Sequence, residues 1–404
     1  MSDRVVITGL GVVTSIGIGW QEFWASLLAG TSGISQMSSF DTAGQFTHKG
    51  GEVKQFRPEE FLDRSRIAEY SRATQMAMAA AKLAAGDAKL DPAGIRASKA
   101  AVCIGTNIGS VQSVEIIDEI MVREKTHDID RALLSQIPTN TTAAAVAREF
   151  DLHGPCVMFS TACAAGNYAL GYGYDLIRLG KADMVMAGGS DALSKVAFTG
   201  FNQFKAVAPE KCQPFDKNRK GMMVAEAAGV LIIESLERAQ ARNAAIYGEI
   251  MGYGLSCDAY HMTASSVEGV AECMKKALRE AGCSSEDVDY ISAHGTGTPT
   301  NDRNECAAIK DVFGDRYTKI PISSIKSMLG HTMGAASALE AITCALVVKN
   351  DMIPPTINFE TPDPECDIDC IPNKARKQTV NVALNNSYAF GGNNASLVVK
   401  KYSY

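Results

Sequence analysis

A cysteine at position 163 stands where an apolar run meets a helix-like segment. Residues 157–159 are Val-Met-Phe, and Cys163 follows them among small residues. A strand that feeds a tight turn and then a helix holds the turn residue over the helix N-terminus, where partial positive charge favours a thiolate. Small neighbours leave room for a thioester to approach. The position therefore suits a nucleophile, and the alternative is a buried structural cysteine, because free cysteine is among the most buried residue types.

Two of the six histidines stand in similar settings further along the chain. His294 follows residues 290–293 and opens the run His-Gly-Thr-Gly-Thr, and His331 stands in the run Gly-His-Thr-Met-Gly. A single histidine beside glycine is more often a structural hydrogen-bonding residue. A cysteine and two histidines in matching settings form a coherent set, which predicts a Cys-His-His catalytic site.

The order of these motifs resembles a known family. Residues 4–14 read Arg-Val-Val-Ile-Thr-Gly-Leu-Gly-Val-Val-Thr, the three catalytic motifs follow, and residues 386–394 read Asn-Ser-Tyr-Ala-Phe-Gly-Gly-Asn-Asn. The chain resembles, over nearly its whole length, the elongating β-ketoacyl-acyl carrier protein synthases of type II fatty-acid synthesis and the ketosynthase subunits of bacterial type II polyketide synthases. Any one motif alone is only suggestive, whereas the ordered set is specific.

The resemblance implies a decarboxylative Claisen condensation. An acyl group would pass from the phosphopantetheine arm of an acyl carrier protein to Cys163, and a malonyl group on a second carrier would lose carbon dioxide to give the attacking enolate. Neutral His294 and His331 would each donate an N–H group to the enolate oxygen. The backbone N–H groups of Cys163 and Phe390 would form the oxyanion hole for acyl transfer. We expect neither a bound cofactor nor a metal, because the carrier protein brings the substrates.

Two charged residues near the second histidine receive supporting roles from the resemblance. Lys326 precedes His331 by five residues, and Glu340 follows it by nine. The expected arrangement is a charge pair that sets the electrostatics and orientation around His331, because a buried cation needs a partner. Taken alone, Glu340 would be assigned to the surface of a helix.

Four residues are expected to contact the substrate. Phe390, between Ala389 and two glycines, resembles the gating phenylalanine of the family, bulky enough to cover the nucleophile and flanked by residues that let the loop move. Thr296 and Thr298 alternate after His294, so both hydroxyls are expected to face one side and contact the pantetheine arm. Ile108 matches a position at the acyl pocket.

Partner surfaces are expected to include a basic patch. Arg64 and Arg66, with Arg72 close by, are the preferred site for the acidic recognition helix of the acyl carrier protein, and a second cluster contains Lys217, Arg219 and Lys220. Solvated surface is the alternative for either cluster. The resemblance also implies a homodimer or a heterodimer with a chain-length-factor-like subunit.

Departures from the fatty-acid pattern favour a polyketide pathway. Met222 replaces a common phenylalanine, Ala225 and Glu226 replace a common Gly-Asp, and residues 301–305 look more like polyketide ketosynthases. Two other functions stay open. A non-catalytic chain-length-factor subunit would usually lack the nucleophile, and a thiolase would use a second cysteine near the C-terminus, which residues 386–392 do not contain.

The elements that must position these residues are those of an α/β protein, since strand-like runs alternate with alanine-rich helical segments. The strand-like runs are residues 5–8, 101–105, 184–187, 230–234, 290–293 and 395–399, and the helical candidates are residues 19–28, 68–86, 163–179 and 337–349. The resemblance implies that they build a thiolase-like layered αβαβα fold with two pseudo-symmetric halves.

The two halves are expected to divide the site between them. Residues 1–245 would carry the nucleophile and residues 246–404 both catalytic histidines, with the seam near residues 242–247. Gly166 lies three residues beyond Cys163, and Gly334 lies three beyond His331. This spacing predicts that the nucleophile and the second histidine occupy equivalent positions in the two halves.

The opening glycines could suggest a dinucleotide-binding protein, but the match is incomplete. Thr14 occupies the place of the third glycine in the Gly-x-Gly-x-x-Gly fingerprint, and no acidic ribose ligand stands at the expected distance. We therefore expect no NAD site.

Composition agrees with a large globular enzyme. The chain has 404 residues, of which 46% are hydrophobic and 21% charged, enough to bury a large core. A net charge of −6 without a basic stripe argues against nucleic-acid binding. The absence of a signal-like start and of an apolar run of about 20 residues predicts a cytoplasmic protein without a membrane span. The eleven cysteines are expected to be reduced, and Cys366 and Cys370 lack a second ligand pair for zinc.

Overall fold

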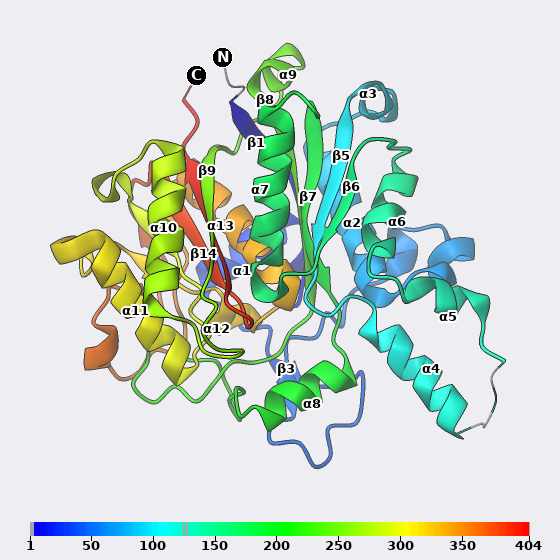
Figure 1. The fold of residues 1–404 in the computed structure, drawn as a ribbon, viewed down its shortest axis with the longest axis horizontal. Coiled ribbons are helices and arrows are strands. Elements are labelled where there is room, and N and C mark those ends of the chain that lie inside the picture. The colour runs from blue at the N-terminus through cyan, green and yellow to red at the C-terminus, as the bar shows by residue number, and fades with distance from the viewer. Residues whose placement is uncertain (1–3, 124–125, 127, 404) are drawn as a thin grey trace.

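The computed structural model describes residues 4–123, 126 and 128–403. Within these ranges eleven strands form one sheet in the order β11-β10-β14-β15-β9-β1-β8-β7-β5-β6, with β2 paired to β1 (Figure 1). The strands are β1 (Val5–Thr14), β2 (Gly17–Ile18), β5 (Ala100–Gly105), β6 (Cys156–Phe159), β7 (Met184–Asp191), β8 (Ala227–Ser235), β9 (Gly248–Cys257), β10 (Tyr290–Ser292), β11 (Ile322–Ser323), β14 (Val382–Tyr388) and β15 (Asn393–Lys400). Two small sheets pair β3 (Ser35–Gln36) with β4 (Lys49–Gly50) and β12 (Met352–Ile353) with β13 (Arg376–Lys377).

The sheet has the same pattern when followed inward from either end. β5 runs parallel to β6 and β7 at one end, and β10 runs parallel to β11 and β14 at the other. The neighbours further in are antiparallel, and β1 meets β9 through only three residue pairs. This repeated order agrees with the predicted pseudo-symmetric halves. The division at residue 245 stays a prediction.

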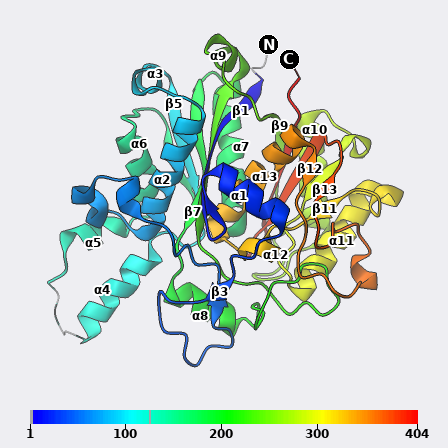
Figure 2. The same cartoon turned by 180° about the vertical axis from the view of Figure 1, so that it is seen from behind.

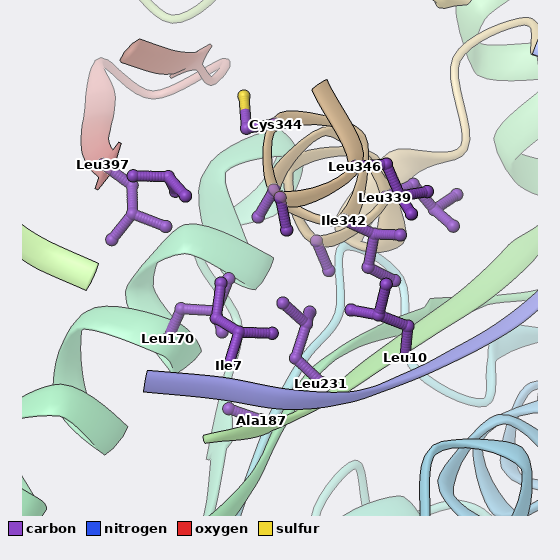
Figure 3. Close-up of a cluster of buried hydrophobic side chains, with 14 of the residues drawn as sticks. Ile7, Leu10, Leu170, Ala187, Leu231, Leu339, Ile342, Cys344, Leu346 and Leu397 are labelled. Carbon is purple, nitrogen blue, oxygen red and sulfur yellow. The ribbon is translucent and has the colours of Figure 1, made fainter. Parts of the chain in front are cut away.

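Two helices form the central layer between the halves of the sheet. α7 (Ala165–Arg178) and α13 (Ala336–Asn350) contact each other, and each contacts strands of both halves. Every residue of 336–348 is buried, because this helix is covered on all sides. Figure 3 shows Leu339, Ile342 and Leu346 of α13 above the side chains of β1 and β8. The cluster forms the hydrophobic core behind the candidate site.

Further helices cover the two outer faces and complete the expected αβαβα order. α2 (Arg72–Asp87) and α6 (Thr141–Glu149) pack on the N-terminal strands, and α10 (Val267–Ala281), with α11 (Pro299–Phe313) beside it, packs on β9 and β15. α4 and α5 project away from the layers in both views (Figures 1 and 2). The remaining helices are α1 (Trp20–Ala29), α3 (Pro92–Ala97), α4 (Val111–Arg123), α5 (Arg131–Gln136), α8 (Lys195–Gln203), α9 (Leu236–Ala241) and α12 (Lys326–Leu329). Short 3-10 helices span Pro58–Glu60, Arg64–Glu69, Ala162–Ala164, Ser285–Asp287, Gly314–Arg316, Met333–Ala335 and Pro364–Cys366.

Two predicted helices begin later than the sequence pattern indicated. α2 starts at Arg72 because Ser71 caps it, its hydroxyl accepting the backbone N–H of Thr74. The predicted helix from residue 163 starts at Ala165, after a 3-10 turn in which Ala162 has a left-handed φ of 49°. A non-glycine residue in this region interrupts regular helix geometry.

The expected equivalence of Cys163 and His331 is wrong when the two halves are matched by their elements. α7 follows the turn Ala162–Ala164, and α13 follows the turn Met333–Ala335. Ala162 and Met333, the first residues of these turns, have left-handed φ values of 49° and 53°. Gly334 therefore holds the place equivalent to Cys163, and His331 lies before the turn.

The opening glycines serve sheet-to-helix packing. Gly9 and Gly11 lie inside the continuous strand β1 and so do not form the phosphate-binding turn of a dinucleotide fold. A Cβ at either position would lie 2.3 Å or 1.8 Å from a backbone oxygen of α2. These glycines allow the close approach of α2 to the sheet. In the described part of the chain we find no helix with the length and hydropathy needed to cross a membrane.

Candidate active site

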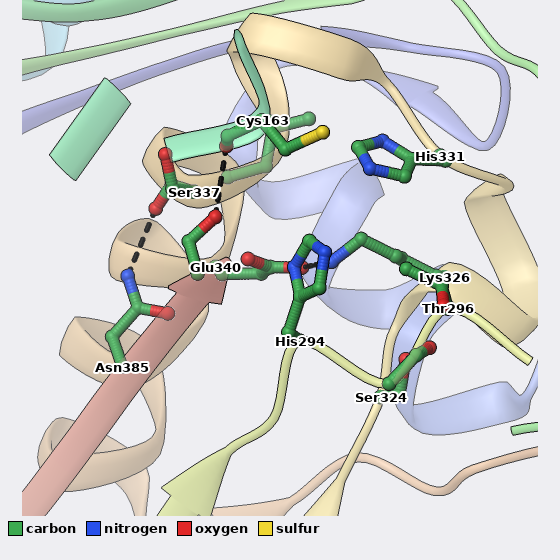
Figure 4. Close-up of polar contacts among 12 residues, drawn as sticks. Cys163, His294, Thr296, Ser324, Lys326, His331, Ser337, Glu340 and Asn385 are labelled. Atoms are coloured by element: carbon green, nitrogen blue, oxygen red, sulfur yellow. Dashed lines mark hydrogen bonds and ion pairs between the residues drawn. The ribbon is translucent and has the colours of Figure 1, made fainter. Parts of the chain in front are cut away.

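The structure brings the three predicted catalytic residues together. Cys163 lies in the 3-10 turn between β6 and α7, His294 follows β10, and His331 follows α12. One ligand-type atom from each of the three side chains lies within 4.8 Å of the others. The two imidazole rings meet edge to face, with their centroids 5.5 Å apart. Figure 4 shows the Cys163 thiol directed toward the histidine rings.

The three side chains line one cavity of about 290 Å³. Met222, Thr296 and Thr298 also line it, and the two threonine hydroxyls lie 2.9 Å apart, on one side as expected. Ile108, expected at the acyl pocket, does not line this cavity and is half-buried in the turn after β5. The full lining is Cys163, Phe201, Phe204, Lys205, Ala206, Met222, Thr263, Ala264, Ser265, His294, Thr296, Thr298, Pro299, Thr300, Asn301, His331, Tyr388, Ala389 and Phe390.

A backbone hydrogen bond sets the tautomer of His331. The N–H of Met333 donates to His331 Nδ1 at 3.0 Å, so that nitrogen is the acceptor and carries no proton. Burial lowers the pKa of His331 well below its ordinary value, and the positive charge of Lys326 acts in the same direction. His331 is therefore a neutral imidazole with its proton on Nε2, and it can donate one hydrogen bond.

His294 is held through its backbone by a buried acid that sequence reasoning missed. The carboxylate of Glu305 accepts the N–H groups of His294 and Gly295, both at 2.8 Å. Burial is the main cause that lowers the pKa of His294, followed by the charge of Lys326. Burial raises the pKa of Glu305 to about 8, although the two N–H groups that donate to this carboxyl act to lower its pKa. Local sequence gives no sign of this role, because Glu305 stands in a helix where acids are usually solvated.

The Cys163 thiol is buried, with 7% of the residue exposed, although it faces the cavity. Burial raises its pKa to about 12, and the charge of Lys326 and the backbone N–H groups of Phe390 and Cys163 oppose this rise. Burial thus disfavours the thiolate that the sequence position predicted. The same two N–H groups approach the sulfur. In a thioester of Cys163, the acyl oxygen would lie next to this sulfur, on the carbon bonded to it.

Lys326 and Glu340 form a buried ion pair between Nζ and Oε1. Their side chains are 2% and 1% exposed, so the surface alternative for Glu340 is wrong. Burial raises the pKa of Glu340 to about 7, and the charge of Lys326 opposes this. The pair brings the positive charge of Lys326 close enough to act on both histidines, and Glu340 compensates that charge.

Phe390 lines the cavity and is followed in its loop by two glycines. It is 39% exposed, and its ring packs against Phe201 and Phe204 at centroid distances of 6.1 and 6.3 Å. Gly391 and Gly392 have left-handed φ values of 85° and 81°. Glycine adopts these angles without strain. The N–H groups of Gly391 and Gly392 donate to the carbonyl groups of Met262 and Ala389.

The donor set is a poor match for a metal ion. Cysteine and two histidines form a common set of zinc ligands. Here Nδ1 of His331 is already occupied by the N–H of Met333. Coordination through Nε2 would move the proton to Nδ1, where it would face that donor. The geometry therefore favours hydrogen-bond donation by His331.

The two candidate docking clusters differ in how freely their charges face solvent. Arg64 is exposed, whereas the Arg66 side chain is 28% exposed and pairs with Glu69 and Glu149. Arg72, close to them in sequence, forms an ion pair with the buried Glu226. In the second cluster Arg219 is buried beside Asp302 and Asp363, which leaves Lys217 and Lys220 exposed.

The arrangement of the layers and of the central helices defines a protein of the thiolase-like fold. Residues 2–239 match the N-terminal domain of β-ketoacyl synthases, and residues 247–360 match their C-terminal domain. The chain belongs to the β-ketoacyl synthase family and is an acyltransferase of the condensing type.

Individual relatives come from fatty-acid and polyketide synthesis. The chain is 39% identical to a 3-oxoacyl-[acyl-carrier-protein] synthase 2 of Synechocystis over 99% of this chain and 98% of the relative. The structure of the ishigamide ketosynthase/chain length factor is 43% identical with a TM-score of 0.97, over the whole of both chains. A type II polyketide ketosynthase, solved with its acyl-carrier protein and a hexaketide, is 34% identical with a TM-score of 0.92, again over both whole chains.

Proposed function

We propose that this protein condenses a Cys163-bound acyl group with malonyl-acyl carrier protein to give a β-ketoacyl-acyl carrier protein. The observation that carries the proposal is the convergence of Cys163, His294 and His331 within 4.8 Å in one cavity. The neutral Nε2–H tautomer of His331 supports it, because a neutral donor stabilises an enolate without protonating it. The substrates arrive on the phosphopantetheine of the carrier, and no bound cofactor takes part.

The first half-reaction loads the acyl group. The Cys163 sulfur attacks the carbonyl carbon of the acyl thioester, a new C–S bond forms, and the bond to the pantetheine sulfur breaks. The proton of the Cys163 thiol is transferred to the departing pantetheine sulfur. The backbone N–H groups of Cys163 and Phe390, which approach the sulfur, stabilise the oxyanion in this step.

The second half-reaction forms the carbon–carbon bond. The malonyl carboxylate leaves as carbon dioxide, and the electron pair forms an enolate whose oxygen accepts N–H groups from His294 and His331. The enolate carbon attacks the acyl carbonyl, the C–S bond to Cys163 breaks, and the thiolate takes up a proton. Lys326, paired with Glu340, favours neutral histidines throughout the cycle.

The remaining site residues guide the substrate in this proposal. Thr296 and Thr298 contact the pantetheine arm, Phe390 gates the cavity, and Ile108 borders the end of a longer acyl chain. The cavity itself supports the first two roles. The N-terminal half, residues 1–245, supplies the nucleophile, and residues 246–404 supply both histidines.

Acyl carrier protein is the proposed partner, together with a second subunit, either another copy or a chain-length-factor-like chain. The similarity to the ishigamide ketosynthase/chain length factor favours the heterodimer and a polyketide pathway. We propose the cytoplasm as its location, where carrier-bound intermediates are made.

Two alternatives have less support. A non-catalytic partner subunit would not need a thiol at the centre of the cavity, and Cys163 occupies that place. A thiolase would need a second cysteine as its base, and Cys163 is the sole cysteine among the described residues that line the cavity.

Intact-mass analysis with a panel of acyl carrier proteins tests the proposal directly. Incubation with carriers that bear different acyl chains should add one acyl group to the protein, and peptide mapping should place it on Cys163. Addition of malonyl carrier should then remove the group and release carbon dioxide. A protein that acquires no acyl group from any carrier in the panel would contradict the function.

The gate can be tested by Phe390→Ala. This change keeps the backbone N–H group but removes the ring, so we expect kcat/KM for acyl loading to fall roughly tenfold. Stability should fall by less than about 2 kcal/mol, because the ring is only partly buried. Phe46→Ala, which removes an exposed ring that does not line the cavity, is the matched control. Equal rates for wild type and Phe390→Ala would exclude the gate.

The docking patch can be tested by charge reversal. Replacement of Arg64 and Arg66 by glutamate should raise the apparent KM for the carrier by about threefold to tenfold, and by less at high salt, because exposed charges are screened. A small acyl-thioester mimic should react at the wild-type rate. Lys217→Glu with Lys220→Glu is the comparison pair. A larger effect in that pair would move the docking surface to the second cluster, and equal slowing on carrier and mimic would indicate structural damage.

A further inference from the structure

A buried aspartate connects two turns that are far apart in the sequence and adjacent in space. Asp191 ends β7, and none of its surface is exposed. Its Oδ1 accepts the hydroxyl of Thr106 at 2.6 Å and the N–H of Ile108 at 3.2 Å. Its Oδ2 accepts the N–H groups of Asn107 at 2.7 Å and Gly334 at 2.6 Å. Four donors from two distant segments therefore converge on one carboxylate.

The two turns are also in direct contact. A Cβ at Gly334 would lie 2.5 Å from the Cα of Thr106, so only glycine allows this approach. Met333, the residue before it, has a left-handed φ of 53°, which methionine rarely adopts. Such a conformation persists where the surrounding contacts enforce it. The bond from Gly334 to Asp191 is one of those contacts.

This turn is the one that sets the tautomer of His331. The N–H of Met333 donates to His331 Nδ1, and the next N–H along the chain, that of Gly334, donates to Asp191. The Gly334 N–H belongs to the Met333–Gly334 peptide, the one directly after the peptide whose N–H reaches the imidazole, so the aspartate anchors the turn next to that donor. Loss of the carboxylate would free the turn to relax from the left-handed angle at Met333.

The Met333–Ala335 turn has an equivalent in the other half of the fold, the Ala162–Ala164 turn. Gly334 occupies the place of Cys163, and each residue lies in a 3-10 turn before a central helix. The N–H of Cys163 approaches its own sulfur, where an acyl oxyanion would be stabilised. The equivalent N–H in the second half donates to the Asp191 carboxylate instead. An internal carboxyl group thus occupies the second anion site, and burial raises its pKa to about 6.

We propose that Asp191 is a positioning residue that holds His331 as its Nε2–H tautomer for malonyl decarboxylation. The inference rests on the proposed condensation. Asp191 does not touch the reacting atoms and acts through the Met333–Gly334 turn. It also ties that turn to the segment of Thr106 and Ile108, so the histidine and the acyl side of the site keep a fixed relation.

The decisive variant is Asp191→Ala, which removes both acceptor oxygens. We expect carbon dioxide release from malonyl carrier protein to fall about tenfold, the scale of one lost hydrogen bond to a charged group. Loading of a butyryl group, which needs no enolate donor, should stay within about threefold of wild type. A loss of the same factor in both half-reactions would show that Asp191 only supports the fold.

Asp191→Asn is the conservative comparison. Its amide oxygen can replace Oδ2 and keep the bonds to Gly334 and Asn107. Its NH₂ group takes the place of Oδ1, where it can donate to the Thr106 hydroxyl but loses the longer bond from the Ile108 N–H. Decarboxylation should therefore recover most of the loss in Asp191→Ala. Asp87→Asn is the matched control, because Asp87 likewise accepts several hydrogen bonds. Its three donors are Leu10, Trp20 and Tyr247, none of which lines the cavity. It should leave the ratio of the two half-reactions unchanged.

A spectroscopic readout separates this inference from the proposed function. Nitrogen NMR of the imidazoles distinguishes a protonated from an unprotonated ring nitrogen, and loss of a signal in His331→Ala assigns that residue. Wild type should show His331 protonated on Nε2, Asp191→Ala a mixture of tautomers, and Asp191→Asn mainly Nε2–H. An Nδ1–H tautomer in wild type, or an unchanged spectrum in a folded Asp191→Ala, would overturn the inference. If Asp191→Ala does not fold, Asp191→Ser, whose single short hydroxyl cannot replace both acceptor oxygens, takes its place in the same measurement with the same expected mixture of tautomers. Loss of all activity in wild type would instead count against the proposed function.

Discussion

Cys163→Ala is expected to abolish acyl loading and condensation, with a loss on the order of 10⁴-fold or more, as is found when a catalytic nucleophile is removed. The change deletes one sulfur atom at the edge of a cavity, so folding should be nearly unaffected. The measurement is the intact mass of the variant after incubation with acyl carrier protein. Malonyl decarboxylation should persist, because enolate formation requires the histidines and not the thiol.

A second cysteine provides the control for this result. Cys344 is also fully buried, lies in α13 and does not line the cavity. Cys344→Ala should accept an acyl group at nearly the wild-type rate. An acyl adduct on Cys163→Ala, or equal losses in the two variants, would remove Cys163 from its role.

Removal of either catalytic histidine should stop decarboxylation far more than loading. We expect His294→Ala and His331→Ala each to lower carbon dioxide release from malonyl carrier by about 10²–10³-fold, the usual effect of losing one oxyanion donor. Loading should fall much less, since the enolate forms only in the second half-reaction. The two steps are measured separately, by trapped carbon dioxide and by the mass of the acylated protein.

The tautomer of His331 sharpens this test. Glutamine can place an N–H near the position of Nε2–H, so His331→Gln should retain more decarboxylation than His331→Ala. This expectation follows from the hydrogen bond of Met333 to Nδ1, which leaves Nε2–H as the donor. Equal damage to loading and decarboxylation would place the histidines in another role, and an inactive His331→Gln would argue against simple donation.

Burial and a neighbouring lysine together explain why two histidines can act as neutral donors in one small site. Lys326 contributes to the low pKa of both rings, and its pairing with Glu340 keeps the added charge compensated. Burial is the larger cause for each ring. The electrostatics of the site therefore depend on the sheet and central helices that exclude water.

Local sequence pattern predicted the strongest elements well. The apolar runs of β1 and β8 and the alanine-rich segment of α13 have the periods and lengths of buried strands and a helix. The start of α2 was predicted four residues too early, because the 3-10 helix Arg64–Glu69 and the cap residue Ser71 directly precede the helix and no change in residue type marks the boundary. The strand β9 was not predicted, because three glycines interrupt its apolar residues.

The sequence by itself determined which residues could do the chemistry: one cysteine after a strand, two histidines among glycines and hydroxyls, and a phenylalanine between small residues. It did not determine their states. The raised pKa of Cys163, the low pKa of His294 and the burial of Glu340 depend on segments far apart in the chain. Only the tertiary structure brings those segments together and removes water from between them, and both distance and desolvation set the pKa of a buried group.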